Sequence, residues 1–193
     1  MKKLTLHAVE AVDELAWPEN HHEYTLHSSA LDVFTDFKSI KPLVIEASSS
    51  AVEVERLMKK AHVRLKIVID KNQHFIGLVS YNSLNSQEMV KKLVKGESRE
   101  NLMVTDFMIP KSKLKAIAYT DIANAKIGDV IETLKVAGQQ HCLVIDRKDH
   151  TIRGVLSAND IAKKLHLAID VSTPTSFASI FEAISPIPQP LVV

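Results

Sequence analysis

The sequence lacks the features that mark several common classes of protein. It has a single cysteine, Cys142, so no internal disulfide can form, which suits the reducing cytoplasm. Its 24 basic and 23 acidic residues leave a net charge of +1, which gives no general attraction to nucleic acid or to a membrane surface. The apolar residues near the N-terminus are interrupted by Glu10, Asp13 and Glu14. We therefore expect a cytoplasmic protein with neither a signal peptide nor a membrane-spanning segment.

Motifs of catalysis are missing as well. The chain has no P-loop, no Gly-x-Gly-x-x-Gly fingerprint, no His-Glu-x-x-His motif and no Gly-x-Ser-x-Gly elbow. His21, His22 and His27 lack a spacing that would bring metal ligands together. Cys142 belongs to an apolar strand pattern and has no cationic neighbour in sequence that would activate a thiol. We expect no catalytic residue and no metal site, and hence no enzyme.

The stretch Gly-Val-Leu-Ser-Ala-Asn-Asp at 154–160 is the part of the chain most suited to chemistry. Apolar residues at 142–145 and 152–156 predict a hairpin, and the apolar spacing after it predicts a helix with Ser157 as its N-cap. A helix N-terminus offers unpaired N–H groups to a phosphate, and the Asp160 carboxylate can accept two hydrogen bonds from a vicinal diol such as a ribose. The same Ser-x-x-Asp pattern is also an ordinary capping pair. The stretch alone leaves both interpretations open.

From residue 30 onward the chain repeats one order of elements. Each copy has a short lead-in, an apolar strand, a helix with apolar residues at i, i+3, i+4 and i+7, and then a strand pair that ends in Gly-x-x-Ser. The segments that correspond are 30–34 and 104–108, 42–45 and 114–118, 69–70 and 145–146, and 77–80 and 154–157. Each copy is therefore predicted to be strand, helix, strand, strand, helix, in an α/β (α+β) fold.

A duplicated unit of this size has a physical consequence. The sheet of one copy has too few strands to cover both of its faces, so the two copies should pack together and bury a shared core. Equivalent surfaces then meet about an approximate two-fold axis. This arrangement predicts two related clefts between the copies, each facing the loop before a final helix.

The repeats resemble the cystathionine-β-synthase (CBS) domain family, and a tandem pair of them is similar to a Bateman module. The resemblance covers roughly residues 30–166 and rests on the Val/Ala-x-Asp-x-Met/Phe lead-in, the strands ending in Asp70 or Asp146, and Gly-x-x-Ser-x-x-Asp. It implies four segments: an N-terminal helix and loop (1–28), CBS repeat 1 (29–96), CBS repeat 2 (97–168), and a short helix with a Pro-rich tail (169–193).

The resemblance also implies a function. Such pairs bind adenosine-containing ligands (AMP, ADP, ATP or S-adenosylmethionine) and regulate another protein. The ribose-binding aspartate of the family falls on Asp160 and its phosphate-side hydroxyl on Ser157. Base-recognising positions fall on Leu43 and Val63, while Arg64 either reaches a phosphate or is simply solvated. The candidate ligand-binding residues are Ser157, Asp160, Gly154, Arg64, Val63 and Leu43.

The first copy departs from this pattern, because Ser83 stands where the carboxylate should be. A serine cannot hold two ribose hydroxyls with charge-assisted hydrogen bonds. We therefore expect an asymmetric module with one competent cleft, in which Ser80 and Ser83 act only as caps. His141 and Cys142 are the matching positions of the weaker cleft, where a core or surface role is favoured over ligand binding.

The flanking segments and the alternatives complete the expectation. Residues 4–16 predict a short amphipathic helix, 96–100 a linker, and 177–184 an apolar helix that packs on the module or on a second chain. We expect a homodimer that senses an adenosine-containing ligand and acts on a separate, unknown protein. A ligand-free dimeric scaffold that keeps the fold is the alternative, and an enzyme working at the cleft is the least favoured.

Overall fold

A computed structural model of the chain describes residues 3–6, 8, 16, 23–84, 87, 89–90, 98, 101–137, 139–168 and 174–185. The predicted N-terminal helix, the last helix of the first repeat, the linker and the Pro-rich tail lie largely outside these residues. Where the predicted N-terminal helix is described, at 4–6, 8 and 16, the chain is not helical.

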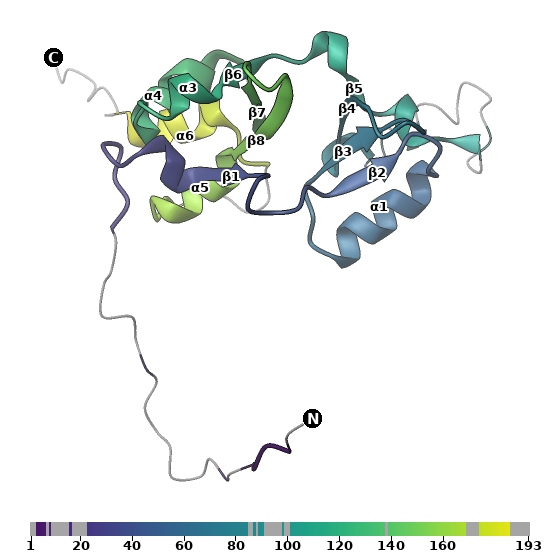
Figure 1. Ribbon diagram of the computed structural model, residues 1–193, viewed down its shortest axis with the longest axis horizontal. Helices are drawn as coiled ribbons and strands as arrows, with labels where there is room; N and C mark the ends of the chain where they lie inside the picture. The colour runs from purple at the N-terminus through teal and green to yellow at the C-terminus, as the bar shows by residue number, and fades with distance from the viewer. Residues whose placement is uncertain are drawn as a thin grey trace, which may run out of the picture.

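Two four-stranded sheets form the framework (Figure 1). The first has the order β2 (Val44–Glu46), β3 (Leu65–Ile69), β4 (Phe75–Ser80) and β5 (Ile109–Pro110). The second has the order β1 (Phe34–Asp36), β8 (Thr151–Ser157), β7 (His141–Asp146) and β6 (Ala116–Ala118). In each sheet one parallel pair, β2 with β3 or β6 with β7, continues into an antiparallel hairpin. The predicted order of strand, helix, strand, strand is confirmed in both repeats.

The helices cover the outer faces of the sheets. They are α1 (Ala51–Lys60), α3 (Tyr119–Ile122), α4 (Ile127–Leu134), α5 (Ala158–Lys164) and α6 (Phe177–Ile184), with short 3-10 turns at Ala30–Val33, Asn82–Leu84, Val104–Asp106, Lys111–Lys113 and Lys135–Ala137. Helix α1 buries Val54 and Met58, which stand at i and i+4 of the apolar pattern. Leu57 stands at i+3 of the same pattern but is 44% exposed, so the inward position that the pattern predicts for it is wrong. The inward face of this ten-residue helix is narrower than the apolar pattern suggested.

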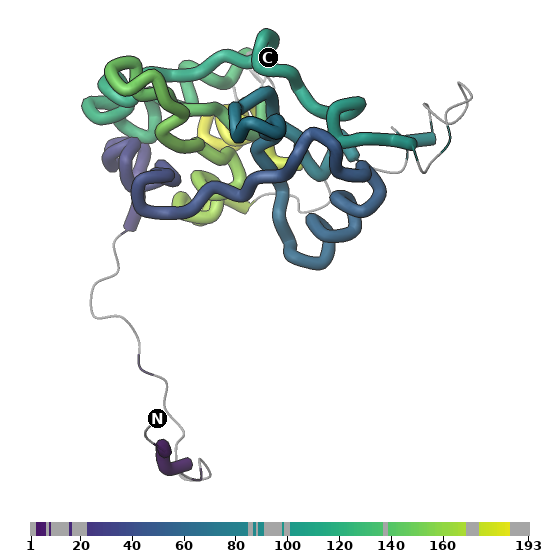
Figure 2. The backbone as a smooth tube through the Cα atoms, turned by 45° about the vertical axis from the view of Figure 1, so that its right-hand side comes forward, coloured from purple at the N-terminus to yellow at the C-terminus, as the bar shows by residue number. Residues whose placement is uncertain are grey.

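The lead-in strand of each repeat pairs with the sheet of the other repeat. Strand β1 lies antiparallel to β8 with Phe34 opposite Leu156, and β5 lies antiparallel to β4 with Ile109 opposite Leu78. Figure 1 shows β1 beside β8, and Figure 2 shows the chain then crossing to the other half. The sequence analysis had assigned each lead-in segment to the repeat that follows it in the chain. The exchange ties the two halves together through backbone hydrogen bonds.

Three apolar clusters follow from this arrangement. One lies in each half, between a sheet and its helices. The third lies between the sheets, where Ile67, Ile69 and Leu78 of the first sheet meet Leu143 of the second. The predicted shared core between the copies is therefore confirmed.

Helix α6 belongs to the second half. Phe177 and Ile180 are fully buried there, and the Lys135 ammonium lies 4.0 Å from the centroid of the Phe181 ring. Of the two predicted partners for this apolar helix, the module itself is the one observed. Within the described part of the chain, no helix combines the length and the apolar character needed to cross a bilayer.

Candidate functional site

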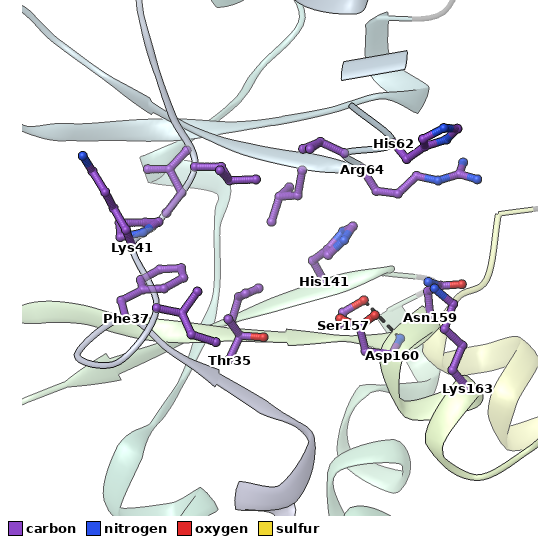
Figure 3. Close-up of a pocket in the computed structure, with 17 residues that line it drawn as sticks. Thr35, Phe37, Lys41, His62, Arg64, His141, Ser157, Asn159, Asp160 and Lys163 are labelled. Atoms are coloured by element: carbon purple, nitrogen blue, oxygen red, sulfur yellow. Dashed lines mark hydrogen bonds between the residues drawn. The ribbon is translucent and has the colours of Figure 1, made fainter. Parts of the chain in front are cut away.

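A pocket of 340 Å³ opens between the two repeats (Figure 3). Both repeats line it, since the turn after α1 (residues 62–64) and β3 supply one wall and β7, β8 and α5 the other. Five of the six candidate residues from the sequence line this pocket: Leu43, Val63, Arg64, Ser157 and Asp160. The residues of the first repeat lie more than 90 positions before Ser157 and Asp160, and the packing of one sheet on the other brings them together.

Gly154 does not line the pocket. It sits within β8 opposite Asp36 of β1, and a Cβ atom there would overlap the Thr35 carbonyl oxygen and the Phe34 ring. Gly77 of the first repeat has the same relation to β5, because a Cβ there would lie 2.5 Å from the Ile109 carbonyl oxygen. The repeated glycines therefore make room for the exchanged strands, and the ligand-binding role expected of Gly154 is corrected to a packing role.

Ser157 caps α5 as predicted, but it forms only half of a capping pair. Its hydroxyl oxygen accepts from the Asp160 N–H at 3.4 Å. In α4 the equivalent carboxylate returns the bond, because Asp129 accepts from the Lys126 N–H at 2.8 Å. Ser157 is at the same time the last residue of β8, where it pairs with His141 of β7. Among the described residues, no hydrogen bond or ion pair uses the Asp160 carboxylate, so this exposed acceptor remains available at the pocket.

His141 lies in the middle of the pocket wall (Figure 3). Burial lowers the pKa of its imidazole to about 4, and the negative charge of Asp160 opposes that shift only in part. The ring is therefore neutral near pH 7 and has one donor and one acceptor nitrogen. Sequence matching assigned His141 to the weaker cleft, whereas the structure brings it to the walls of both clefts.

The pocket has two chemically different ends. Figure 3 shows His62, Arg64 and Lys163 gathered at one end and Phe37 with Lys41 at the other. Apolar side chains of Ile40, Pro42, Leu43 and Ile67 also line the pocket. The shape suits an elongated ligand with an apolar ring system and an anionic tail.

Several lining residues were missed by the sequence analysis. Thr35 and Phe37 reach the pocket through the exchanged lead-in, which no local pattern could have revealed. Lys163 lies three residues after Asp160 on α5, and helical spacing would have placed the two on one face.

The matching cleft of the first repeat measures 280 Å³ and is closed differently. The Asn82 side-chain amide donates across it to the Gln140 side-chain oxygen at 3.0 Å. Ser80 and Ser83 bond to each other's backbone, with the Ser83 N–H donating to the Ser80 hydroxyl at 3.1 Å and the Ser80 N–H to the Ser83 hydroxyl at 3.2 Å. The prediction that both serines are caps is confirmed, and neither hydroxyl replaces a carboxylate.

Cys142 lines neither cleft. It is a buried residue of β7, as predicted, and burial raises the pKa of its thiol to about 11. The thiolate needed for nucleophilic chemistry is therefore strongly disfavoured at neutral pH. The described residues contain no group of three or more His, Cys, Asp or Glu side chains that could hold a metal ion.

Comparison with known proteins bears on the family. Residues 34–86 match the model of the CBS domain. No curated protein sequence matches the chain.

Solved structures extend the likeness to most of the chain. An uncharacterized conserved protein of Pyrococcus horikoshii is 16% identical with a TM-score of 0.53, and the match covers 76% of this chain and 98% of that one. CBSX2, a protein of Arabidopsis thaliana solved in complex with AMP, is 20% identical with a TM-score of 0.51, over 70% and 94% of the two chains. A conserved CBS domain protein of unknown function from Thermoplasma acidophilum is 16% identical with a TM-score of 0.51, over 78% and 76%. The chain thus carries a CBS domain at residues 34–86 and has the fold of a tandem CBS pair, a Bateman module.

Proposed function

We propose that the chain is a regulatory module that binds an adenine nucleotide between its two repeats and acts on a separate protein. The observation that carries the proposal is the Asp160 carboxylate, which lines the inter-repeat pocket while no hydrogen bond or ion pair in the described residues uses it.

The ribose is the part of the ligand that Asp160 would bind. The two oxygens of one carboxylate can accept from the two O–H groups of a vicinal diol, and hydrogen bonds to a charged acceptor are worth about 1.5–3 kcal/mol each. The Ser157 oxygen already accepts the Asp160 N–H, but its own O–H can still donate to a phosphate oxygen. Arg64, on the facing repeat, offers a planar guanidinium that pairs well with phosphate.

The base would lie toward the apolar end. The Leu43 carbonyl already accepts from the Ile67 N–H at 2.9 Å, and the Val63 N–H already donates to the Met58 carbonyl at 2.9 Å. The Leu43 N–H and the Val63 carbonyl are therefore the backbone groups we assign to the adenine edge. That the similarly folded CBSX2 was solved in complex with AMP supports this choice of ligand class.

Regulation, rather than catalysis, follows from where the ligand would sit. A ligand that touches both repeats binds best to one relative position of them, so its binding energy can shift the population of that arrangement. A partner that recognises the same arrangement would then be coupled to the ligand.

The homodimer, the cytoplasmic location and the repeat boundaries at 29–96 and 97–168 stay predictions.

Calorimetric titration with AMP tests the proposal. We expect Asp160→Ala to weaken AMP binding by about tenfold to a few hundredfold, because at least one charge-assisted hydrogen bond is lost. Asp149→Ala is the matched control, since Asp149 lies in an exposed turn outside the pocket, and its affinity should equal that of the wild type. Unchanged binding by Asp160→Ala would overturn the site. Absence of binding by AMP, ADP and ATP would overturn the function, and absence of binding by S-adenosylmethionine as well would favour the ligand-free scaffold.

A further inference from the structure

A second pocket, of 530 Å³, continues from the polar end of the first. The two pockets share His62, Val63, Arg64, Asn159 and Lys163. The second adds Met58 and Lys59 of α1 and Tyr81, the residue that follows β4. A ligand that fills the first pocket can therefore extend into the second without leaving the protein surface.

The second pocket is lined by basic side chains and by no acidic one. Lys59, Arg64 and Lys163 carry positive charges, and the ring of His62 adds a hydrogen-bonding group beside them. In the described part of the chain none of these four forms an ion pair, whereas Lys135 pairs with Glu132. Uncompensated like charges that face one cavity repel one another, and a bound polyanion relieves that repulsion.

The cations come from both repeats. Lys59 and His62 are fixed at the end of α1, where the His62 N–H donates to the Lys59 carbonyl and the Val63 N–H to the Met58 carbonyl. His62 holds the left-handed conformation with φ 53° that this helix ending requires. Lys163 lies opposite, on α5 of the second repeat. A negatively charged group between them would contact both halves.

We propose that the preferred ligand is an adenine nucleotide with at least two phosphate groups, whose outer phosphates occupy the basic pocket of Lys59, His62, Arg64 and Lys163. This inference rests on the proposed function and adds the ligand's charge to it. A single phosphate next to Ser157 leaves Lys59 without an anion, because Lys59 lines the second pocket and not the first. S-adenosylmethionine, with its sulfonium and ammonium cations, is disfavoured by the same charges.

Titrations with AMP, ADP and ATP, carried out without divalent cations at low and high salt, test the inference. We expect ADP and ATP to bind at least about tenfold more tightly than AMP, with an advantage that shrinks as salt screens the charges. Lys59→Ala should weaken ADP and ATP more than AMP and so reduce that ratio. Lys60→Ala, which removes the neighbouring charge outside both pockets, should keep the wild-type ratio.

The outcomes separate the two proposals. One outcome is that AMP binding depends on Asp160 but ADP and ATP bind no more tightly than AMP. This outcome overturns the present inference and leaves the proposed function standing. Lack of binding by all three nucleotides overturns both. Inorganic pyrophosphate is the third arm: we expect it to bind far more weakly than ADP, and equal affinity would show a free polyphosphate site instead of a nucleotide site.

Discussion

Gly154 illustrates how a single residue can be fixed by a strand that is distant in sequence. Its missing side chain leaves the space into which the Thr35 carbonyl and the Phe34 ring pack. We expect Gly154→Ala to lower the free energy of unfolding by about 1–3 kcal/mol or more, because backbone atoms of β1 must move. Urea denaturation measures the loss.

Gly128→Ala is the control for that experiment. Gly128 lies in the first turn of α4, where the nearest atom to an added Cβ is the Leu26 carbonyl oxygen at 3.2 Å. Alanine also has the better helix propensity, so this variant should lose clearly less stability than Gly154→Ala. Equal losses would contradict the packing role of Gly154.

His141 makes stability depend on pH. Its pKa is about 4 in the folded chain against 6.5 for an ordinary histidine, so between these values the unfolded chain binds more protons. Stability should therefore fall as pH drops from 6.5 to 4, by on the order of 3 kcal/mol from this group. Denaturation of wild type and His141→Gln at several pH values isolates the effect, because the variant should lose less stability over this window. Parallel pH profiles of the two proteins would rule it out.

At the scale of elements, the exchanged strand β1 is held by an ion pair as well as by backbone bonds. The Arg153 guanidinium donates from Nε and Nη2 to the two Asp36 carboxylate oxygens at 2.7 Å each. Arg153 also lies 4.3 Å from the centroid of the Tyr119 ring and 3.7 Å from the Asp146 carboxylate. One side chain of β8 thus links β1 to β7 and to α3.

The hydrogen bonds from Arg153 are the main reason that the pKa of Asp36 is lowered to about 2. Since the folded pKa lies below the usual 3.8, this pair stabilises the fold above about pH 4 and is lost as pH falls toward 2. We expect Arg153→Met to return the Asp36 pKa toward 3.8 in an NMR titration. Lys38→Met should move it much less, because the charge of Lys38 is the smallest of the causes. An unshifted pKa in Arg153→Met would contradict this account of the strand.

At the scale of the whole molecule, the pseudo-symmetric pair is functionally unequal. One cleft has a carboxylate without a hydrogen-bond or ion-pair partner in the described residues, and the other has two serines bonded to each other and a bridge from Asn82 to Gln140. His141 and Leu65 line both, so the two clefts share a wall. Duplication supplied two sites, and only one has the chemistry for a nucleotide.

We therefore expect one adenine nucleotide to bind per chain, as measured by the stoichiometry of a calorimetric titration. Ser83→Ala should leave both the stoichiometry and the affinity as they are in the wild type, because Ser83 lines neither the first pocket nor its basic extension. Two equivalent sites per chain would contradict the asymmetry.

Local sequence patterns determined much of this protein. Apolar spacing predicted the hairpin of β7 and β8, the helices α1, α4 and α5 and the Ser157 cap, because these depend on residues close together in the chain. The duplicated order of elements predicted the two sheets and the core between them. Five of the six candidate residues, which the resemblance to CBS pairs had assigned, line one pocket.

Tertiary structure decided the rest. Whether the Asp160 carboxylate caps its own helix depends on the position of the Ser157 backbone. Ser157 pairs with His141 and is therefore the last residue of a strand. The exchange of β1 and β5 brings Thr35 into the pocket and gives Gly154 its packing role. The basic pocket unites Lys59 and Lys163 from different repeats. Each depends on contacts between residues far apart in sequence, and periodicity along one segment carries no information about which distant segment will lie beside it.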